Sequence, residues 1–217
     1  MNISQLAKDI YLKFSTYEGS KHIASEFAIL KLLELVKIFK VQSVFEIGLG
    51  IGTLPSAIFE LTKGEVIYTG TEPNDFCKES LSNNIPKIYY QKITVLDDVP
   101  QKMKKNQKYD LIIVDGVFTT IEKIFQILPK RPIIAVEGDR KDQVDILKTY
   151  FPKSINVHCV SAENNDPNGV FDSSTWQGGV KVFFLKPSFK QYIYYIKNKF
   201  KSRSNYQKRR KYKAKYA

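Results

Sequence analysis

Three glycines on alternate positions follow a short apolar run and form the clearest chemical feature of the chain. The run is Ser43–Ile47, and Gly48, Gly50 and Gly52 come directly after it. Glycine tolerates positive φ angles and lets a ligand approach the backbone closely. A helix that begins after the last glycine, capped by Thr53, would present unpaired amide N–H groups, which bind anions. The stretch therefore predicts a sharp turn from a buried strand into a helix, with a ligand site at the turn.

Two classes of ligand use a turn of this kind. A dinucleotide fingerprint requires Gly-x-Gly-x-x-Gly, but the third glycine position, counted from Gly48, is occupied by Thr53. In contrast, an acid-x-Gly-x-Gly-x-Gly pattern that runs from Glu46 to Gly52 is complete. A glycine turn with a purely structural role is the alternative, because a tight strand-to-helix turn needs glycine in any α/β protein.

Acidic residues also stand at the ends of three further apolar runs, which we expect to be strands: residues 65–71 before Glu72, residues 88–96 before Asp97, and residues 109–114 before Asp115. The carboxyl ends of parallel strands meet at one edge of a sheet, so these acids should surround a single crevice together with Glu46. Glu72 lies 20 residues past Gly52, near the distance at which a carboxylate meets a bound ribose in such folds. Ionised carboxylates suit this role, because both ribose hydroxyls are hydrogen-bond donors.

On these residues the chain resembles the class I S-adenosylmethionine-dependent methyltransferases, whose first motif is an acid followed by alternating glycines. The resemblance covers roughly residues 18–138, and its pieces come in the right order. It implies an α/β fold with a doubly wound, mostly parallel, Rossmann-like sheet of seven strands, and S-adenosyl-L-methionine as cofactor. The cofactor-binding residues that it implies are Glu46, Gly48, Gly50, Gly52, Glu72, Leu96, Asp97 and Asp115. Leu96 would lie against the adenine ring, and Asp97 would face its amino group.

The segment before the first strand is similar to the substrate-side loop of small-molecule O-methyltransferases of the caffeoyl-CoA type. Residues 17–22 are polar and separate two predicted helices at residues 3–14 and 25–40. A hydroxyl acceptor needs a base, and we expect both Asp115 and His22 to border the open side of the crevice. Asp115 is the first catalytic candidate and His22 the second; the alternative for His22 is an ordinary surface histidine.

Acidic residues that follow the fourth and fifth predicted strands are candidate ligands of a metal ion. In metal-dependent members of the resembling family, carboxylates or an amide at these strand ends hold magnesium. Asp115, Glu137 and Asp139 could supply oxygen ligands of this kind. However, the family pattern has adjacent ligands after the fifth strand, and here Gly138 separates Glu137 from Asp139. Strand-end acids without Mg²⁺ are therefore expected, and magnesium binding is the alternative.

The second half of the chain continues the alternation of helices and strands. The expected elements are a helix at residues 117–128, a strand at 131–136, a helix at 142–151, and strands at 154–160 and 179–185. Residues 161–178 form a long polar loop between the last two strands. Long loops in compact domains are often lids or binding loops. The loop holds the single tryptophan of the chain, Trp176, which we expect to anchor the loop; stacking on an acceptor is the alternative.

Length and composition indicate one globular unit of 217 residues, 43% of them hydrophobic. We expect N-terminal helices on the substrate side at residues 1–42, a cofactor-binding core at residues 43–187 and a basic helical tail at residues 188–217. The chain shows no signal-peptide pattern and no apolar run of membrane-spanning length, and its two cysteines have no metal or disulfide spacing. These features favour a cytoplasmic protein.

The net charge of +12 is concentrated in the tail. From residue 173 onward there are 13 Lys and Arg and no Asp or Glu, whereas residues 1–172 hold 21 basic and 22 acidic residues. Residues 189–200 also show an apolar stripe at helical spacing with lysines around it. Three interpretations of residues 189–217 remain open: a docked helix followed by a disordered tail, a helix on an anionic membrane surface such as the inner membrane face, and an arm that binds nucleic acid. Under each of them, deletion of residues 201–217 is expected to spare the fold.

The resemblance implies a methyltransferase that O-methylates a small molecule, a sugar or a lipid-linked glycan. Enzymes that methylate nucleobases often carry Asn/Asp-Pro-Pro-aromatic after the fourth strand, whereas this chain reads Asp115-Gly116-Val117-Phe118. Two other classes remain as alternatives. One is an RNA methyltransferase that uses the basic tail, and the other is a catalytically silent binding protein that keeps the fold.

Overall fold

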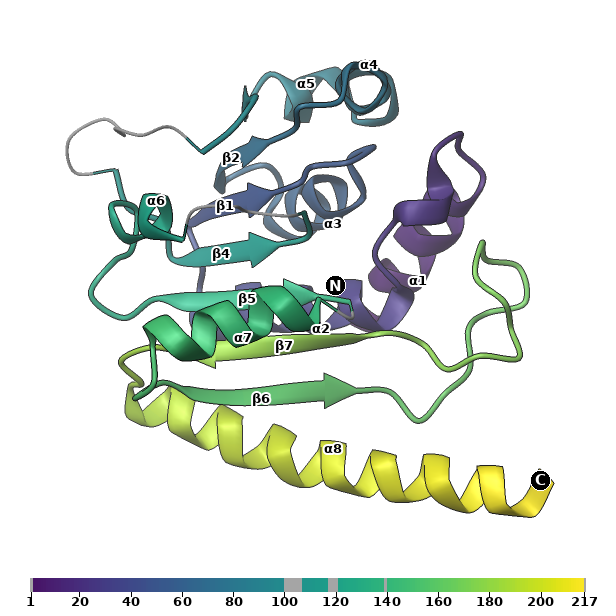
Figure 1. Ribbon diagram of the computed structural model, residues 1–217. Coiled ribbons are helices and arrows are strands. Elements are labelled where there is room, and N and C mark those ends of the chain that lie inside the picture. Colours follow the sequence, from purple (N-terminus) through teal and green to yellow (C-terminus); the bar gives the residue numbers. More distant parts are fainter. Residues whose placement is uncertain (1, 100–106, 117–120, 139, 217) are drawn as a thin grey trace.

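The computed structural model describes residues 2–99, 107–116, 121–138 and 140–216, which form a seven-stranded sheet flanked by helices (Figure 1). The strands are β1 Ser43–Ile47, β2 Ile67–Thr71, β3 Ile93–Leu96, β4 Leu111–Val114, β5 Ile133–Glu137, β6 Ile155–Val160 and β7 Gly179–Phe184. Their order across the sheet is β3-β2-β1-β4-β5-β7-β6. Of these strands, β7 alone runs in the direction opposite to the other six. The predicted α/β fold with a mostly parallel, doubly wound sheet is confirmed.

Both faces of the sheet are buried, and β4 shows how the sequence achieves this. Leu111 and Ile113 belong to one core cluster, whereas Ile112 and Val114 belong to another. Successive side chains of a strand point to opposite faces, so a strand covered by helices on both sides needs an apolar residue at every position. All four side chains are fully buried.

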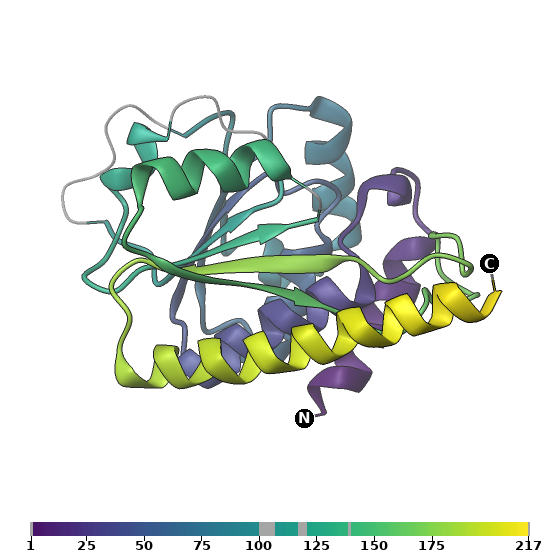
Figure 2. The ribbon, with the colours of Figure 1, turned by 60° about the horizontal axis from the view of Figure 1, so that its bottom comes forward.

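The helices are α1 Ile3–Ser15, the short 3-10 helix η1 Ser20–His22, α2 Glu26–Phe39, α3 Thr53–Thr62, α4 Asp75–Asn84, α5 Lys87–Tyr90, α6 Glu122–Phe125, α7 Lys141–Tyr150 and α8 Phe189–Tyr216. Buried residues of α1, α2 and α3 contribute to the first core cluster, and those of α6 and α7 to the second. Helix α8 packs along β6 and runs the length of the molecule (Figure 2).

The direction of the strand order reverses between β1 and β4. From β1 the chain proceeds outward to β2 and β3, and then returns to place β4 on the other side of β1. Open parallel sheets bind ligands beyond the carboxyl ends of the strands at such a point. Ile47 pairs with Val114 at these ends, so the glycine turn that follows β1 and Asp115 that follows β4 lie side by side.

Several predicted element boundaries differ from those in the structure, and two of them differ most. The expected strand at residues 88–96 is shorter, because α5 occupies its first part and β3 begins at Ile93. Pro86 precedes this helical turn, and its carbonyl accepts hydrogen bonds from the amides of Tyr89 and Tyr90. Tyr89 then stacks on Phe59 of α3, a tertiary contact that local propensity does not reveal. The other difference concerns the helix expected at residues 117–128. Its described part, residues 121–128, is α-helical at Glu122–Phe125 (α6), and residues 117–120 lie outside the described residues.

The C-terminal segment corrects the interpretation of residues 201–217 as a disordered tail. Helix α8 continues to Tyr216, and its later turns hold the loop between β6 and β7. Asn205 Nδ2 donates to the Val160 carbonyl at 2.7 Å, and Arg209 Nε donates to the Ser161 carbonyl at 2.7 Å. The Arg209 guanidinium also lies over the Trp176 ring, so this tryptophan does anchor the loop. These contacts lead us to expect that deletion of residues 201–217 destabilises the protein, in contrast to the expectation from the sequence.

We predict that Asn205→Ala destabilises the protein, because it leaves the buried Val160 carbonyl without its hydrogen-bond donor. The free energy of unfolding should fall by about 1–3 kcal/mol. The matched control is Ser204→Ala, one residue away on the exposed side of the same helix, which should change this free energy by less than about 0.5 kcal/mol. Urea denaturation measures both, and equal stabilities of the two variants would contradict the anchoring role of α8.

Candidate active site

The three glycines of the turn after β1 all adopt left-handed conformations, for three different reasons. Gly48 has φ +89°, and a Cβ atom there would lie 2.8 Å from the backbone nitrogen of Gly116, which follows β4. Gly52 has φ +97° and packs against Leu81 and Ile85 in the same way. Gly50 has φ +53°, and a Cβ built on it would meet no heavy atom within 4 Å. The outer two glycines permit close packing, whereas the middle one faces open space.

Gly52 is the N-cap residue of α3, and Thr53 is the first residue inside the helix. The prediction that Thr53 caps the helix was therefore wrong. No side chain caps this helix, so its first amide groups are left to the glycine turn and to a ligand.

Glu72 ties the end of β2 to the glycine turn. Its Oε2 accepts a hydrogen bond from the Gly50 amide at 2.7 Å, and its Oε1 accepts one from the Asn74 amide at 3.0 Å. The side chain is buried. Each oxygen of an ionised carboxylate can accept more than one hydrogen bond, so Glu72 keeps capacity for a ligand hydroxyl.

A cavity of about 200 Å³ opens at this turn. Its lining comes from the N-terminal loop and η1, the end of β1, the glycine turn, the start of α4 and the end of β4, and includes Gly19, His22, Glu46, Gly50, Asn74, Phe76 and Asp115. The structure thus brings together both predicted catalytic candidates, Asp115 and His22, with the predicted cofactor residues Glu46 and Gly50.

Leu96 and Asp97, the predicted adenine-side pair, stand at the end of β3 and outside this lining. Asp97 is exposed, and its carboxylate pairs with Lys78 Nζ at 2.5 Å. Their proposed contact with the adenine of a cofactor stays a prediction.

The loop that contains η1 covers the cavity. The packing of this loop against α4 could not be predicted from the sequence. Gly19, with φ +82°, packs so closely that a Cβ atom there would lie 2.9 Å from the Phe76 ring and 3.0 Å from Ile51. Phe76 lies on α4 and is 42% exposed, so the aromatic ring forms an outer wall of the cavity. In the sequence, the glycine within the polar segment at residues 17–22 was the one sign of this contact. Its partner, Phe76, lies almost sixty residues later and could not be identified from the sequence.

Glu46 is fully buried beneath the cavity. The Tyr68 hydroxyl donates a hydrogen bond to Glu46 Oε2, whereas Oε1 has no hydrogen-bond partner among the described residues. Burial raises the pKa of this carboxyl well above its ordinary value, and the nearby Asp115 raises it further. Burial therefore favours the protonated form of Glu46 in the free protein, and its second oxygen has no hydrogen-bond partner among the described residues.

Asp115 and Glu137 form a second buried acidic pair at the ends of β4 and β5. Burial raises the pKa of Asp115 to about 6, although the guanidinium of Arg140 opposes this shift. Arg140 Nη2 donates to Asp115 Oδ1 at 2.9 Å and also to the Asp115 backbone carbonyl. The pKa of Glu137 is raised well above its ordinary value by burial and then by Asp115. The two carboxyls form a hydrogen bond; burial favours the protonated form of Glu137, while the Asp115 pKa of about 6 favours the ionised form of Asp115 at neutral pH.

These groups fit a guanidinium better than the Mg²⁺ that was considered for Asp115, Glu137 and Asp139. A carboxylate ligand of Mg²⁺ must be deprotonated, whereas in the free protein burial favours the protonated form of Glu137, and Asp115 contacts Arg140. Asp139 lies outside the described residues. Within the described part of the chain, no three His, Cys, Asp or Glu side chains form a group that could hold a metal.

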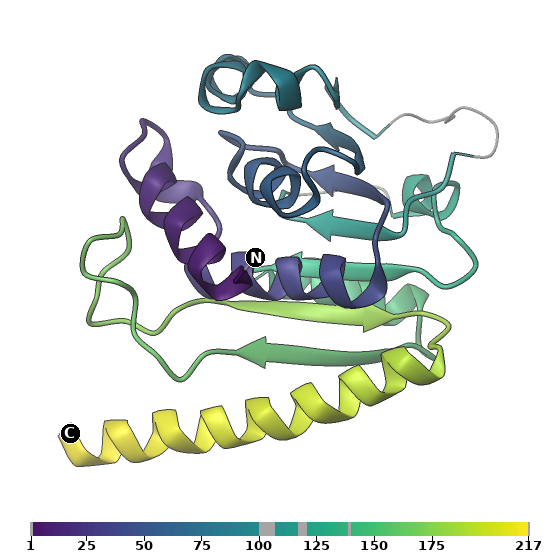
Figure 3. The same cartoon turned by 180° about the vertical axis from the view of Figure 1, so that it is seen from behind.

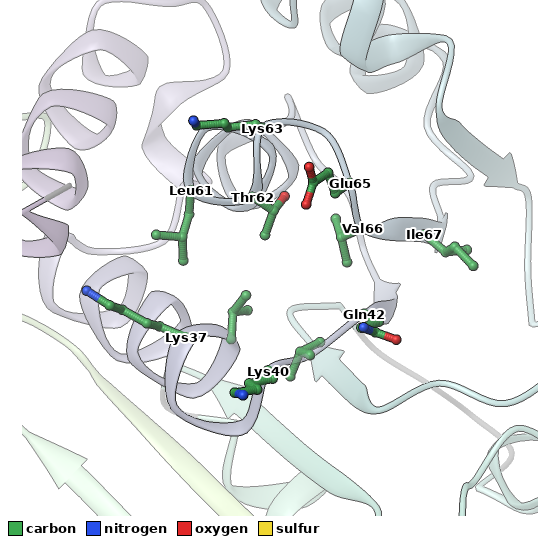
Figure 4. A pocket seen from close by; sticks show the side chains of 11 residues that line it. Lys37, Lys40, Gln42, Leu61, Thr62, Lys63, Glu65, Val66 and Ile67 are labelled. Atoms are coloured by element: carbon green, nitrogen blue, oxygen red, sulfur yellow. The ribbon is translucent and has the colours of Figure 1, made fainter.

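A larger cavity of about 720 Å³ lies at the opposite edge of the sheet (Figure 4). It is formed by the ends of α2 and α3 and the starts of β1 and β2, with Lys37, Lys40 and Lys63 around apolar walls such as Leu61 and Val66. It faces the amino ends of the strands and holds none of the predicted site residues. We therefore place the functional site at the smaller cavity, where the strands end.

Solved structures of methyltransferases share this fold. An O-methyltransferase from Bacillus cereus in complex with SAH matches with a TM-score of 0.63 at 13% identity, covering 83% of this chain and 90% of that one. A candidate caffeoyl-CoA O-methyltransferase from Staphylococcus aureus has a TM-score of 0.55 at 14% identity, over 75% and 84% of the two chains. A candidate RNA methyltransferase from Pyrococcus horikoshii has a TM-score of 0.55 at 14% identity, over 83% and 97%.

Comparisons with protein-family models and with the curated proteins find no match. The structural matches show that the chain has the fold of the class I S-adenosylmethionine-dependent methyltransferases. The resemblance inferred from the glycine turn and the strand-end acids is confirmed at this level.

The raised pKa of Glu46 predicts a pH-dependent stability. In the unfolded chain this carboxyl ionises near its ordinary pKa of 4.5, whereas in the folded protein its pKa is higher. The folded state therefore binds the extra proton above pH 4.5, and stability falls as pH rises toward the folded pKa, by up to about 1.4 kcal/mol per pH unit. Glu46→Gln mimics the protonated acid and should remove this component of the pH dependence.

Urea denaturation of the wild type and of Glu46→Gln between pH 5 and 8 measures the effect. The variant should gain stability relative to the wild type as pH rises. Glu79→Gln, at an exposed position on α4, is the control and should follow the wild type at every pH within about 0.5 kcal/mol. Parallel curves for the wild type and Glu46→Gln would show that Glu46 is ionised in the folded protein.

Proposed function

We propose that this protein is an S-adenosylmethionine-dependent methyltransferase that transfers a methyl group to a hydroxyl of a small molecule, a sugar or a lipid-linked glycan. The observation that carries the proposal is the single cavity that joins Gly50 of the glycine turn to Glu46 and Asp115, with His22 at its rim. The family fold supports the choice of cofactor, and the layout shared with O-methyltransferases supports the choice of acceptor.

The chemistry of the cavity suits this cofactor. S-adenosylmethionine carries a sulfonium and an ammonium, and the carboxyls of Glu46 and Asp115 line the cavity, while Glu72 accepts a hydrogen bond from the amide of Gly50, which also lines it. A cation lowers the pKa of nearby acids, so binding would favour the ionised forms that burial disfavours in the free protein. Glu72 has remaining acceptor capacity for the ribose hydroxyls, and the open side of Gly50 leaves space for the ligand.

The reaction is an in-line displacement at the methyl carbon. The acceptor oxygen forms a bond to this carbon while the bond to sulfur breaks, and the acceptor proton passes to a base. Asp115 is that base in our proposal, because it lines the cavity and its pKa of about 6 leaves it ionised at neutral pH. Arg140 orients the carboxylate, and Glu137 retains its own proton. His22, on the covering loop, is the second candidate for the base.

A second function is supported by the structural match to a candidate RNA methyltransferase and by the lysines and arginines of α8. In that case the acceptor would be a nucleotide, and the basic helix would contact phosphates. A binding protein without catalytic activity would keep cofactor affinity and lack transfer. Incubation of the protein with fractionated cell extracts and methyl-labelled S-adenosylmethionine would identify the acceptor, and the identity of the acceptor distinguishes these functions.

For cofactor binding, we predict that Glu72→Ala weakens the affinity for S-adenosylmethionine tenfold to a hundredfold, equal to about 1–3 kcal/mol. The variant removes both the ribose acceptor and the anchor of the Gly50 amide. Glu79→Ala, at an exposed position on α4, should bind like the wild type. Titration calorimetry measures all three, and an unchanged affinity of folded Glu72→Ala would contradict the assignment of the site.

For catalysis, we predict that Asp115→Asn lowers the methyl-transfer rate by at least about a hundredfold, because an amide cannot accept the proton. The wild-type kcat/KM, which reports the free enzyme, should rise as pH increases through about 6, since Asp115 must lose its proton to act as a base. Asp142→Asn, at an exposed position on α7, should keep the wild-type rate and pH profile. Transfer of labelled methyl groups to a metabolite extract provides the assay, and a fully active Asp115→Asn would assign the base elsewhere.

A further inference from the structure

Helix α8 turns its apolar side chains away from the protein. Large hydrophobic residues of its first half are exposed to solvent: Phe189 (81%), Tyr192, Ile193, Ile196 and Phe200 (68%). At about 100° per residue, these positions fall on one side of the helix. Figures 1 and 3 show α8 as the outermost element at this edge, with no other segment on its far side.

The side of α8 that faces the protein is, by contrast, mostly polar. Its buried residues are Gln191, Tyr194, Asn198, Ser202 and Asn205, each at most 8% exposed. A helix that only covered a core would place its apolar stripe inward and its polar residues outward. This arrangement is reversed in α8, so the apolar stripe is left uncovered by the described part of the chain.

Basic side chains line the apolar stripe. Four lysines recur at intervals of 7, 4 and 7 residues and therefore share one flank of the helix: Lys190, Lys197, Lys201 and Lys208. Between α8 and α2 a cleft of about 270 Å³ adds Lys37 to this flank. The acid of that cleft, Glu34, is already paired with Lys31 at 2.5 Å. Helix α8 itself contains no Asp or Glu.

We propose that the outer face of α8 binds the surface of an anionic lipid bilayer. The exposed phenylalanine and isoleucine side chains would enter the boundary between head groups and acyl chains, and the lysine flank would contact anionic head groups. The helix would then lie parallel to the membrane plane. Among the described residues no helix is long and apolar enough to cross a membrane, so this is a surface contact.

Two other partners fit this face less well. Nucleic acid binds to lysines and to aromatic rings that stack on bases, but it offers no site for aliphatic side chains such as Ile193 and Ile196. A second copy of the chain would bring two acid-free basic helices together, and their charges would repel. An anionic bilayer accommodates both the aliphatic groups and the positive charge.

The test is binding of the full-length protein to lipid vesicles, measured by co-sedimentation. Vesicles of phosphatidylcholine with about one-third phosphatidylglycerol should bind the wild type at least tenfold more strongly than pure phosphatidylcholine vesicles, and added salt should weaken the binding. Ile193→Ser/Phe200→Ser should weaken binding to the anionic vesicles at least tenfold. Lys197→Gln/Lys201→Gln/Lys208→Gln should weaken it similarly and remove its dependence on salt.

The matched control is Ile67→Ser/Ile88→Ser, which removes two exposed isoleucines, one on β2 and one on α5. Both elements lie at the other edge of the sheet from α8 (Figure 1). This variant should bind vesicles like the wild type, and circular dichroism should show that all variants are folded. The proposal is overturned if the wild type does not bind anionic vesicles or if the Ile193/Phe200 variant binds them unchanged. Stronger binding to single-stranded RNA than to vesicles, at equal salt, would also overturn it.

Discussion

The concentration of buried carboxyl groups at one end of the sheet is the constraint on which the site depends. Glu46, Glu72, Asp115 and Glu137 lie at the carboxyl ends of four neighbouring strands, where burial penalises negative charge. Burial favours the protonated forms of Glu46 and Glu137, and two backbone amides donate hydrogen bonds to Glu72. Both effects reduce this penalty. The result is a cavity that is preorganised for a cation and holds few negative charges until a cation arrives.

Arg140 adds a positive charge to this group of buried carboxyls. Its guanidinium stabilises the ionised form of Asp115, so that one of the two linked carboxyls at β4 and β5 keeps its charge while the other keeps its proton. Removing a partner from such a cluster leaves an uncompensated buried group, which costs more than a surface ion pair contributes. The same arrangement provides a base with a pKa near 6 beside the cavity, which is useful for deprotonating a hydroxyl.

Much of this site could be predicted from the sequence, because glycines and acids at strand ends have strong local signals. The strands β1, β2 and β4 are apolar runs that end at the predicted places, and Gly50, Glu46 and Asp115 meet as expected. The parts of the site that could not be predicted depend on contacts between segments that are distant in the sequence. Phe76 meets Gly19 only in the fold, and Arg140 follows a residue that was considered as a metal ligand.

The C-terminal helix shows a different limit of sequence patterns. Periodicity identified an apolar stripe from Phe189 to Phe200, but it could not show which side of the helix faces the protein. The inward side is held by polar contacts such as that of Asn205, which have no periodic hydrophobic signal. A helix is usually assumed to turn its apolar stripe inward, and here tertiary hydrogen bonds determine the opposite orientation.

The most direct test of the acid-lined cavity is calorimetric titration with S-adenosylmethionine in buffers of different ionisation enthalpy. A cationic ligand beside Glu46 and Asp115 lowers their pKa values, so binding should release protons, and the affinity should increase from pH 5 to pH 7. S-adenosylhomocysteine lacks the sulfonium charge and should release fewer protons. Absence of binding, or equal proton release with both ligands, would contradict the account.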